Sequence, residues 1–262
     1  MKSSAVRTAL LTSIVVNLVA ISTVLLLLHK MGGWGYLKAK YYEYTVGSPY
    51  SDPSRPFYES TAYRQAVSIH DLIPVEEGDV VFMGDSHAAQ GHWSEFFGTT
   101  RVRNRGISGD NTEGVLRRLE PVLAGSPSAL FLFIGSNDVN ERYKGLSVDE
   151  TVANVERILS EARASSPETE VFLLSAPPKS RNTTLNTTET PLAHALSERY
   201  ASLEFEAGAV YVDILGALTD SGGSLRVDYT EDGGHLNGAG YEAVVNVLRA
   251  HVESALNRVV TR

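Results

Sequence analysis

The sequence predicts an α/β protein in which a parallel sheet, covered by helices on both faces, follows one N-terminal transmembrane helix. Five short apolar runs are typical of buried strands, and they are residues 79–84, 101–107, 129–135, 170–178 and 209–214. The segments between them, such as 147–165 and 240–256, have apolar residues at helical spacing. Apolar strands that alternate with helices favour a parallel sheet, because each crossover places a helix against one of its faces.

Residues 9–28, ALLTSIVVNLVAISTVLLLL, are predicted to be a membrane anchor. At 1.5 Å per residue, about 20 uncharged residues span the roughly 30 Å of hydrocarbon in a bilayer. Lys2 and Arg7 precede the stretch, as in a signal sequence, but residues 29–31 offer no small-x-small cleavage site. We expect an uncleaved signal-anchor in the cell membrane with the following domain on the extracytoplasmic side, and secretion after signal cleavage is the alternative. Basic residues on both flanks leave the orientation less secure.

The predicted organisation has four parts. Residues 1–8 are the N-terminal flank, and 9–28 are the anchor. Residues 29–74 are a tether rich in Gly, Pro, Ser and Tyr, which ends in a lead-in helix over 59–73 closed by Pro74. Residues 75–262 form the folded domain.

Two helices of the folded domain have clear signals. Ser147 and Glu150 form a capping box at the start of the helix over 147–165. Its apolar face consists of residues three or four positions apart, which are Val148, Val152, Val155, Leu159 and Ala162. The last helix, over 240–256, presents Val244, Val245, Leu248 and Val252 to the core in the same way. We assign these residues to packing.

Composition excludes several classes of protein. The chain of 262 residues is 43% hydrophobic and 21% charged, which is typical of a soluble globular domain and excludes a disordered or polytopic membrane protein. A net charge of -8, with no cluster of Lys and Arg, argues against a nucleic-acid partner. The absence of cysteine excludes disulfides, thiolate metal sites and a cysteine nucleophile, and it leaves the redox compartment open.

Polar residues follow four of the predicted strands at the point where each strand ends. These are Asp85 and Ser86 in GDSH, Gly109 in GISGDN, Asn137 and Asp138 in GSND, and Asp232 and His235 in DYTEDGGHLNGAGY. In an open parallel sheet, ligands bind outside the carboxyl ends of the strands. We therefore expect these residues to meet at one edge of the sheet.

Each of these residues also has a simpler interpretation. Ser86 alone is typical of a helix cap, Asn137 of a turn, and His235 with Asp232 of a surface pair. The set and its order favour catalysis instead. A serine hydroxyl becomes a nucleophile when a histidine such as His235 takes its proton and an acid such as Asp232 orients the ring. The main-chain amides of Ser86 and Gly109, with the Asn137 side chain, would stabilise the oxyanion.

With these residues in place, the sequence resembles the SGNH hydrolase superfamily, also called GDSL-type esterases and lipases. The four motifs GDSH, NRGISGDNTEG, GSND and DGGHLNGAGY match in the order of that family. In detail, the chain is most similar to the catalytic subunits of intracellular platelet-activating-factor acetylhydrolase and to related bacterial acylhydrolases. The resemblance covers about residues 75 to 256, so the anchor and the tether lie outside it.

The resemblance implies a flavodoxin-like three-layer α/β/α sandwich with five parallel strands. It implies that Ser86 is the nucleophile, that Asp232 and His235 complete the triad, and that Ser86, Gly109 and Asn137 form the oxyanion hole. It also implies supporting roles for Asp85 and Asp138, and a reaction with no metal and no cofactor.

Three features are interpreted separately from the four motifs. His87 stands where the family most often has leucine, and we interpret it as a partly exposed residue at the helix start, or as one that tunes Ser86 or contacts substrate. Residues 179–191 are interpreted as a loop at the entrance to the site. The remaining histidines, which are His29, His70, His92, His194 and His251, lack metal-ligand spacing and are interpreted as structural or solvated.

These observations predict a membrane-anchored serine esterase that acts through an acyl-enzyme on Ser86, with water as the acceptor. Few aromatic residues and no apolar lid favour short acyl or acetyl esters on a glycan or small lipid. Lysophospholipase or lipase activity on longer chains is the alternative, and transfer to another alcohol also stays open. A non-catalytic glycan- or surface-binding domain has no need of all five site residues. The oligomeric state stays open.

Overall fold

The computed structural model describes residues 15–23, 26, 29–30, 33, 56–140, 145–183 and 186–258, with the backbone alone at 204–207. The chain divides into two compact units, Met1–Asp52 and Pro53–Arg262. Within the described ranges, no helix is both long enough and apolar enough to cross a bilayer. Much of the predicted anchor over 9–28 lies outside those ranges, so the anchor and the four-part division stay predictions.

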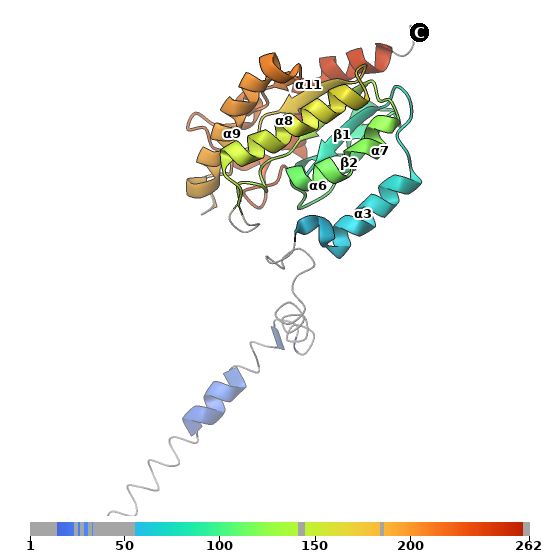
Figure 1. Ribbon diagram of the computed structural model, residues 1–262. Coiled ribbons are helices and arrows are strands. Elements are labelled where there is room, and N and C mark those ends of the chain that lie inside the picture. Colours follow the sequence, from blue (N-terminus) through green and yellow to red (C-terminus); the bar gives the residue numbers. More distant parts are fainter. Residues whose placement is uncertain are drawn as a thin grey trace, which may run out of the picture. The chain divides into compact units, whose positions relative to one another are not determined.

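A five-stranded parallel sheet forms the centre of the second unit, in the order β2-β1-β3-β4-β5 (Figure 1). Its strands are β1 (Val80–Gly84), β2 (Val102–Gly106), β3 (Ala129–Phe133), β4 (Glu170–Leu174) and β5 (Val210–Val212). This order is that of a flavodoxin-like sheet, with a topological switch point between β1 and β3. The predicted strand count and parallel pairing are confirmed.

The register aligns the ends of the three strands that precede the first three motifs. Val80 in β1 pairs with Val102 in β2 and with Ala129 in β3. At the other end of β1, Gly84 pairs with Gly106 and with Phe133. The segments that follow these strands therefore leave the sheet at the same level.

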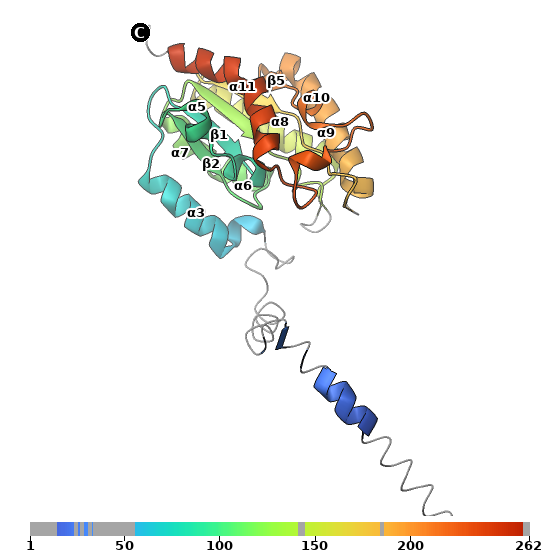
Figure 2. The same cartoon turned by 180° about the vertical axis from the view of Figure 1, so that it is seen from behind.

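Helices cover both faces of the sheet, as predicted. One face is covered by α6 (Thr112–Arg117), α7 (Leu119–Ala124), α8 (Val148–Ser165) and α9 (Asn186–Ala207) (Figure 1). The other face is covered by α4 (Ser86–Ala89), α5 (Trp93–Phe97), α10 (Leu215–Leu218) and α11 (Gly238–Arg258) (Figure 2). The capping box of Ser147 and Glu150 is confirmed at the start of α8.

Side chains that alternate along the strands form two cores. In β1, Val81 and Met83 pack on the side of α8, while Val80 and Phe82 pack on the side of α11. Phe82 stacks on the Trp93 ring, with the centroids 4.0 Å apart. Burial of one large apolar side chain contributes about 1.5–3 kcal/mol to folding. A strand whose side chains are buried on both faces is therefore held firmly in place, and so is its carboxyl end.

Helix α9 begins inside the segment that was expected to be a loop. Its first residue is Asn186, so the interpretation of 179–191 as a loop is wrong for the last six positions. The Asn186 side chain donates to the carbonyl oxygen of Lys179 at 2.6 Å, and the Lys179 amide donates to the Thr190 hydroxyl at 3.0 Å. These contacts with Lys179 hold the start of the helix, whereas Asn, Thr and Pro by themselves favour a turn.

The lead-in segment, made of η1 (Phe57–Glu59) and α3 (Thr61–Leu72), packs against α6. The Tyr63 hydroxyl donates to the carbonyl oxygen of Gly114 at 2.7 Å, and the Arg117 guanidinium lies 3.7 Å from the centroid of the Tyr58 ring. The predicted helix over 59–73 is confirmed as α3. It belongs to the same compact unit as the sheet.

Candidate active site

Ser86 is the first residue of the helix that follows β1. Asp85 caps this helix, because its carboxylate accepts a hydrogen bond from the His87 amide at 2.9 Å. A Cβ on Gly84 would lie 1.9 Å from the carbonyl oxygen of Phe133, so only glycine lets β3 approach this turn so closely. Ser86 itself is 8% exposed. The sequence thus places a nearly buried hydroxyl at the carboxyl end of a central strand.

The loop between η3 (Val227–Tyr229) and α11 brings Asp232 and His235 to Ser86. Nδ1 of His235 lies 2.6 Å from Oδ2 of Asp232, and Nε2 of the same ring lies 3.0 Å from Oγ of Ser86. Oδ1 of Asp232 also accepts hydrogen bonds at 2.8 Å from the amides of Gly234 and His235. Residues that are 149 positions apart in the sequence therefore form a continuous line of contacts from serine to aspartate.

Hydrogen bonds keep the Asp232 carboxyl group ionised. Burial by itself raises its pKa, but hydrogen bonds from the ring and amide of His235 and from the Gly234 amide outweigh burial, so the pKa lies well below its usual range. A carboxylate only accepts, so Nδ1 of His235 carries the hydrogen. Nε2 then presents its lone pair to the Ser86 hydroxyl, which is the state in which the ring can take a proton.

Gly109 and Asn137 lie on the loops that follow β2 and β3. Gly109 has φ +88°, a left-handed conformation that glycine adopts without strain. Nδ2 of Asn137 donates to the carbonyl oxygen of Asp110 at 2.8 Å. That bond uses one of the two amide hydrogens of the side chain, which leaves the second for a ligand. The two loops are thus joined beside the end of β1.

Two buried acids support these loops, and Asp138 joins one to the other. Asp138 accepts hydrogen bonds from the amide of Thr112 at 3.1 Å and from its hydroxyl. Asp110 forms a buried ion pair with Arg118 at 2.7 Å. Burial raises the pKa of Asp110 to about 6, although Arg118 lowers it. Burial raises the pKa of Asp138 to about 7 against the hydrogen bonds from Thr112.

An aromatic residue that was not predicted from the sequence packs against the Gly109 loop. A Cβ on Gly109 would lie 2.9 Å from the ring of Phe57. The Phe57 ring packs edge-on against Tyr63, with the centroids 5.9 Å apart. No sequence signal marks Phe57, because it precedes all four motifs and its partner is remote along the chain.

His87 is buried, so its interpretation as a partly exposed residue is wrong. Only 2% of it is exposed, and its ring packs on Phe133 with the centroids 5.2 Å apart. Nδ1 lies 3.3 Å from Oδ1 of Asp85, and Nε2 lies 3.2 Å from the carbonyl oxygen of Gly234. The ring thus contacts both the Ser86 turn and the His235 loop.

A polar cluster lies beside the His235 loop. Nζ of Lys179 lies 3.7 Å from Oε2 of Glu189, and Oε1 of Glu189 accepts a hydrogen bond from Asn140 at 3.0 Å. A Cβ on Gly234 would lie 3.2 Å from Nζ of Lys179, so the ammonium group is next to the residue that precedes His235. This side of the site therefore offers hydrogen-bonding groups.

The other described histidines lie apart from the triad. His194 contacts the carbonyl oxygen of Gly223 at 2.8 Å, and His251 packs on the ring of Phe172. Across the described part of the chain, no group of three or more His, Cys, Asp and Glu side chains is arranged to hold a metal ion.

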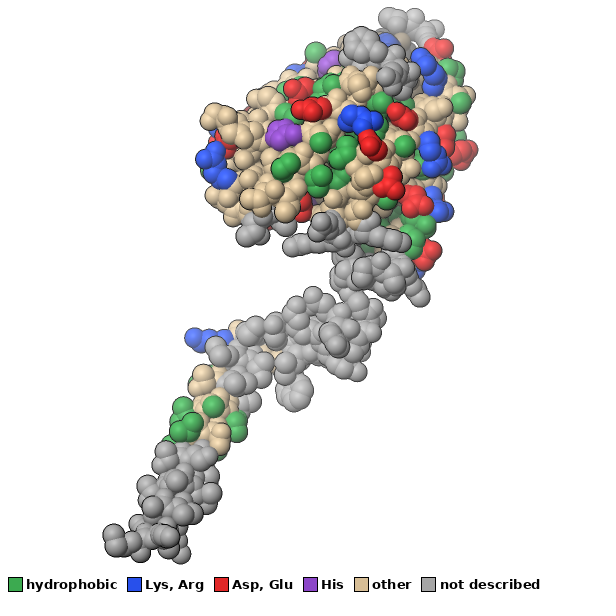
Figure 3. All heavy atoms as spheres, turned by 60° about the vertical axis from the view of Figure 1, so that its left-hand side comes forward, with side chains coloured by type: hydrophobic (Ala, Val, Ile, Leu, Met, Phe, Trp, Pro, Cys, Tyr) green, Lys and Arg blue, Asp and Glu red, His purple; other side chains and the backbone are tan. Residues whose placement is uncertain are grey.

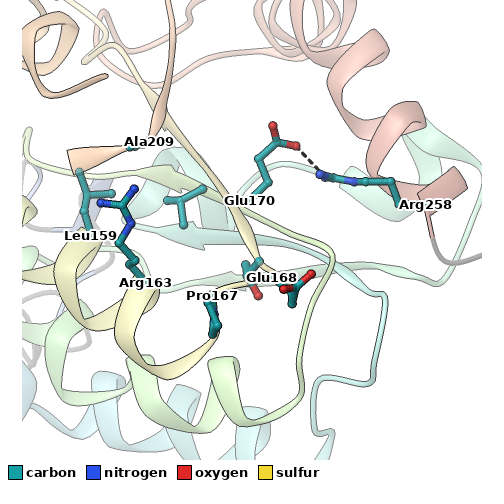
Figure 4. Close-up of a pocket in the computed structure, with 10 residues that line it drawn as sticks. Leu159, Arg163, Pro167, Glu168, Glu170, Ala209 and Arg258 are labelled. Atoms are coloured by element: carbon teal, nitrogen blue, oxygen red, sulfur yellow. Dashed lines mark ion pairs between the residues drawn. The ribbon is translucent and has the colours of Figure 1, made fainter. Parts of the chain in front are cut away.

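A cavity of about 320 Å³ opens at the opposite edge of the sheet (Figure 4). Its lining includes Arg163, Glu170 and Arg258, and an ion pair joins Glu170 to Arg258 at 2.7 Å. It lies at the amino end of β4, whereas the predicted site residues follow the carboxyl ends of the strands. None of those residues lines it.

Charges of both signs share the surface. On the face in Figure 3, basic side chains are interspersed with acidic ones, and no basic patch gathers there. This agrees with the net charge of -8.

Comparison with known proteins places most of the second unit in one family. Residues 78–243 match the model of the GDSL-like Lipase/Acylhydrolase family. The platelet-activating factor acetylhydrolase IB subunit alpha2 of Rattus norvegicus is 26% identical over 179 residues, which cover 66% of this chain and 75% of that protein.

Solved structures show the same similarity. A candidate platelet activating factor protein from Streptococcus pneumonia is 30% identical with a TM-score of 0.64, over 72% of this chain and 90% of that one. A catalytic mutant of an acetylxylan esterase from Geobacillus stearothermophilus is 19% identical with a TM-score of 0.56, over 69% of this chain and 96% of that one. At 19% identity the likeness shows the fold alone.

Proposed function

The chain belongs to the GDSL-like lipase/acylhydrolase family and is an ester hydrolase, and from this premise we propose that it removes short acyl groups through an acyl-enzyme on Ser86. The observation that carries the proposal is the contact of 3.0 Å between Nε2 of His235 and Oγ of Ser86. Asp232, 2.6 Å from the other ring nitrogen, fixes the tautomer that this role requires.

The first step is attack of the Ser86 oxygen on the ester carbonyl carbon. As the new C–O bond forms, the hydroxyl proton passes to Nε2 of His235. The imidazolium that results is stabilised by the Asp232 carboxylate, which stays ionised throughout. The 8% exposure of Ser86 limits competition from water for this hydrogen bond.

The negative charge that develops on the carbonyl oxygen needs hydrogen-bond donors. We assign this role to the main-chain amides of Ser86 and Gly109 and to the remaining amide hydrogen of Asn137. The anchoring bond from Asn137 to Asp110 fixes the direction of that hydrogen. Each such donor contributes on the order of 3 kcal/mol to transition-state stabilisation.

Collapse of the tetrahedral intermediate breaks the bond to the leaving alcohol. His235 returns its proton from Nε2 to the departing oxygen, which leaves an acyl group on Ser86. Water then enters, His235 takes one of its protons, and the hydroxide attacks the acyl carbon. The second collapse breaks the bond between Oγ of Ser86 and the acyl carbon, His235 returns its proton from Nε2 to that oxygen, and the carboxylic acid is released.

We assign the substrate to the class of acetyl or other short acyl esters on a polar alcohol such as a glycan. One of the similar proteins is named for an acetyl ester, as an acetylhydrolase. The cluster of Lys179, Glu189 and Asn140 beside the His235 loop suits a hydroxyl-rich leaving group. A lysophospholipid with a longer acyl chain is the second candidate, favoured by the anchor that the sequence predicts.

We also infer that residues 9–28 anchor the enzyme in the cell membrane with the ester hydrolase domain on the extracytoplasmic side. The support is the length and apolarity of that stretch and the absence of a cleavage site after it. Fractionation of cells that express the full chain tests the inference. Recovery of the cleaved domain from the medium would instead support secretion.

Hydrolysis of p-nitrophenyl esters of increasing acyl length by the purified full chain tests the proposed function, with Ser86→Ala as the matched control. We expect a rate that falls beyond short chains and that is lost in Ser86→Ala. A rate that rises with chain length would move the substrate to lipids. Turnover that persists in the folded Ser86→Ala variant would overturn the proposed nucleophile.

A further inference from the structure

His87 forms a second connection between the Ser86 turn and the His235 loop. Its Nε2 lies 3.2 Å from the carbonyl oxygen of Gly234, which is 147 positions away in the sequence. The neighbouring contact joins Ser86 to His235. Each residue of the pair 86–87 thus contacts one residue of the pair 234–235. The rings of His87 and His235 lie 5.7 Å apart between centroids.

Both partners of the His87 ring are hydrogen-bond acceptors. A carbonyl oxygen only accepts, so a hydrogen bond to Gly234 requires a hydrogen on Nε2. The other nitrogen, Nδ1, lies 3.3 Å from Oδ1 of Asp85, which also accepts the His87 amide. With 2% exposure, the ring has little access to water that could replace either partner.

The backbone of His87 is also restrained. The Tyr241 hydroxyl of α11 donates to the His87 carbonyl oxygen at 2.9 Å. Helix α11 begins three residues after His235, so the same helix supports both segments that His87 joins. A ring on so fixed a backbone can restrain a flexible neighbour.

The neighbour that needs restraint is the glycine pair before His235. Gly233 has φ +84°, and neither Gly233 nor Gly234 has a side chain that could pack. The Gly233 carbonyl oxygen accepts from the Ser180 amide at 2.8 Å, and the Gly234 carbonyl oxygen faces His87. Loss of the second contact would leave the peptide between Gly234 and His235 restrained on its amide side, where the His235 amide donates to Asp232 at 2.8 Å, but no longer on its carbonyl side. Misplacement of a catalytic base by even a fraction of an ångström lowers the rate.

We propose that His87 is a positioning residue, which fixes the loop of His235 against the nucleophile turn by donating to the Gly234 carbonyl oxygen. It does not touch the reacting atoms. It acts through the distance between His235 and Ser86, so its removal lowers kcat and leaves KM nearly unchanged. The inference rests on the proposed function, because it assigns His235 the role of base.

Three substitutions in the full chain separate this role from packing. His87→Leu fills the space beside Phe133 without any donor. His87→Gln carries an amide that can reach the Gly234 carbonyl oxygen, whereas the shorter side chain of His87→Asn reaches only the Asp85 side. His251→Leu is the matched control, because it removes a ring that packs on Phe172 away from the triad.

The measurements are kcat and KM with a short p-nitrophenyl ester and the thermal midpoint of each variant. We expect kcat to fall about 10-fold in His87→Leu and His87→Asn, which corresponds to about 1.4 kcal/mol, with KM within a factor of about two. We expect His87→Gln to regain most of the rate and His251→Leu to match the parent.

Two results would overturn the positioning role. One is a folded His87→Leu variant with the parent kcat. The other is a His87→Gln variant that is no faster than His87→Asn, since the donor to Gly234 would then not matter. Ser86→Ala, measured in parallel, tests the proposed function separately. If Ser86→Ala keeps its turnover, the proposed function fails, and the inference about His87 fails with it. If Ser86→Ala is inactive and His87→Leu keeps the parent kcat, only the role of His87 is overturned.

Discussion

Asn137 donates its side-chain amide to the main-chain carbonyl oxygen of Asp110 at 2.8 Å, which ties the loop after β3 to the loop after β2. These are the loops that carry two of the assigned oxyanion donors. The contact therefore orients the second amide hydrogen of Asn137 before any substrate binds. Preorganised donors of this kind account for a large share of rate enhancement in acyl transfer.

Asn137→Ala is expected to lower kcat by about 100-fold or more, with a small change in KM, because one oxyanion donor is lost. Steady-state kinetics with a short acyl ester measures it. Asn182→Ala, outside the assigned machinery, is the control and should keep the parent rate. An unchanged kcat in Asn137→Ala would move the donor role to another group.

Gly109→Ala is expected to lower kcat/KM by about 100-fold or more. The methyl group would meet the Phe57 ring at 2.9 Å, and alanine is strained at φ +88°. Gly98→Ala is the matched control, since Gly98 has φ +66° but no atom within 4 Å of the added Cβ. We expect Gly98→Ala to lose stability and keep its kcat.

The steric part of the Gly109 effect can be separated from the backbone part. Phe57→Ala opens the space that the new methyl group needs. We expect the double variant Phe57→Ala/Gly109→Ala to recover part of the activity that Gly109→Ala loses, because the strain at φ +88° remains. Equal activities of the double variant and Gly109→Ala would show that Phe57 plays no part.

Asp232→Asn is expected to lower kcat by about 1,000-fold or more, because an amide no longer fixes the hydrogen on Nδ1 of His235. The amide oxygen of asparagine can still accept from the main chain of the loop, so the variant should fold. Asp228→Asn, which removes only an exposed pair with Arg226, is the matched control. A small effect of Asp232→Asn, similar to that of Asp228→Asn, would contradict the triad.

Asp138 makes stability depend on pH. Its pKa is about 7 in the folded protein against 3.8 as the ordinary value, so between about pH 4 and pH 7 the folded state binds a proton that the unfolded state has released. The free energy of unfolding therefore falls as pH rises through this window, by at most about 1.4 kcal/mol per pH unit from this group.

Asp138→Asn tests this directly, because asparagine resembles the protonated acid and does not titrate. Urea unfolding at pH 4.5 and pH 8 should show the variant gaining stability relative to the parent at the higher pH, by about 1 kcal/mol or more. Asp110 titrates in the same sense in both proteins, and its charge is one of the causes of the raised pKa of Asp138. A difference that stays constant with pH would contradict the raised pKa of Asp138.

Most of the sheet could be predicted from local pattern. The runs around Val80–Gly84 and Ala129–Phe133 are apolar on both faces, and this follows from their burial between two helix layers. The capping box of Ser147 and Glu150 marks the start of α8 because both partners lie within one helical turn. By contrast, the start of α9 at Asn186 was not predicted. The local sequence favours a turn there, whereas the hydrogen bond from Asn186 to Lys179 that supports the helix start is a feature of the folded structure.

The residues of the candidate site likewise divide into those that could be predicted from the sequence and those that could not. Ser86, Gly109, Asn137, Asp232 and His235 were predicted because each stands just after an apolar run or in a family motif. The burial of His87 and the packing of Phe57 on Gly109 were not, because each depends on a partner far away in the sequence.

The sequence by itself determined the parallel α/β class, the edge at which polar residues gather, and the residue types that suit acyl transfer. The pairing of His235 with Ser86 was also predicted from the motifs. Only the tertiary structure decided that Asn137 donates to Asp110 and that His87 contacts Gly234. The physical reason is the separation along the sequence of the residues that interact. Periodicity, caps and turns depend on neighbours within a few residues, whereas these contacts require the level register of β1, β2 and β3 and the return of the chain through α11.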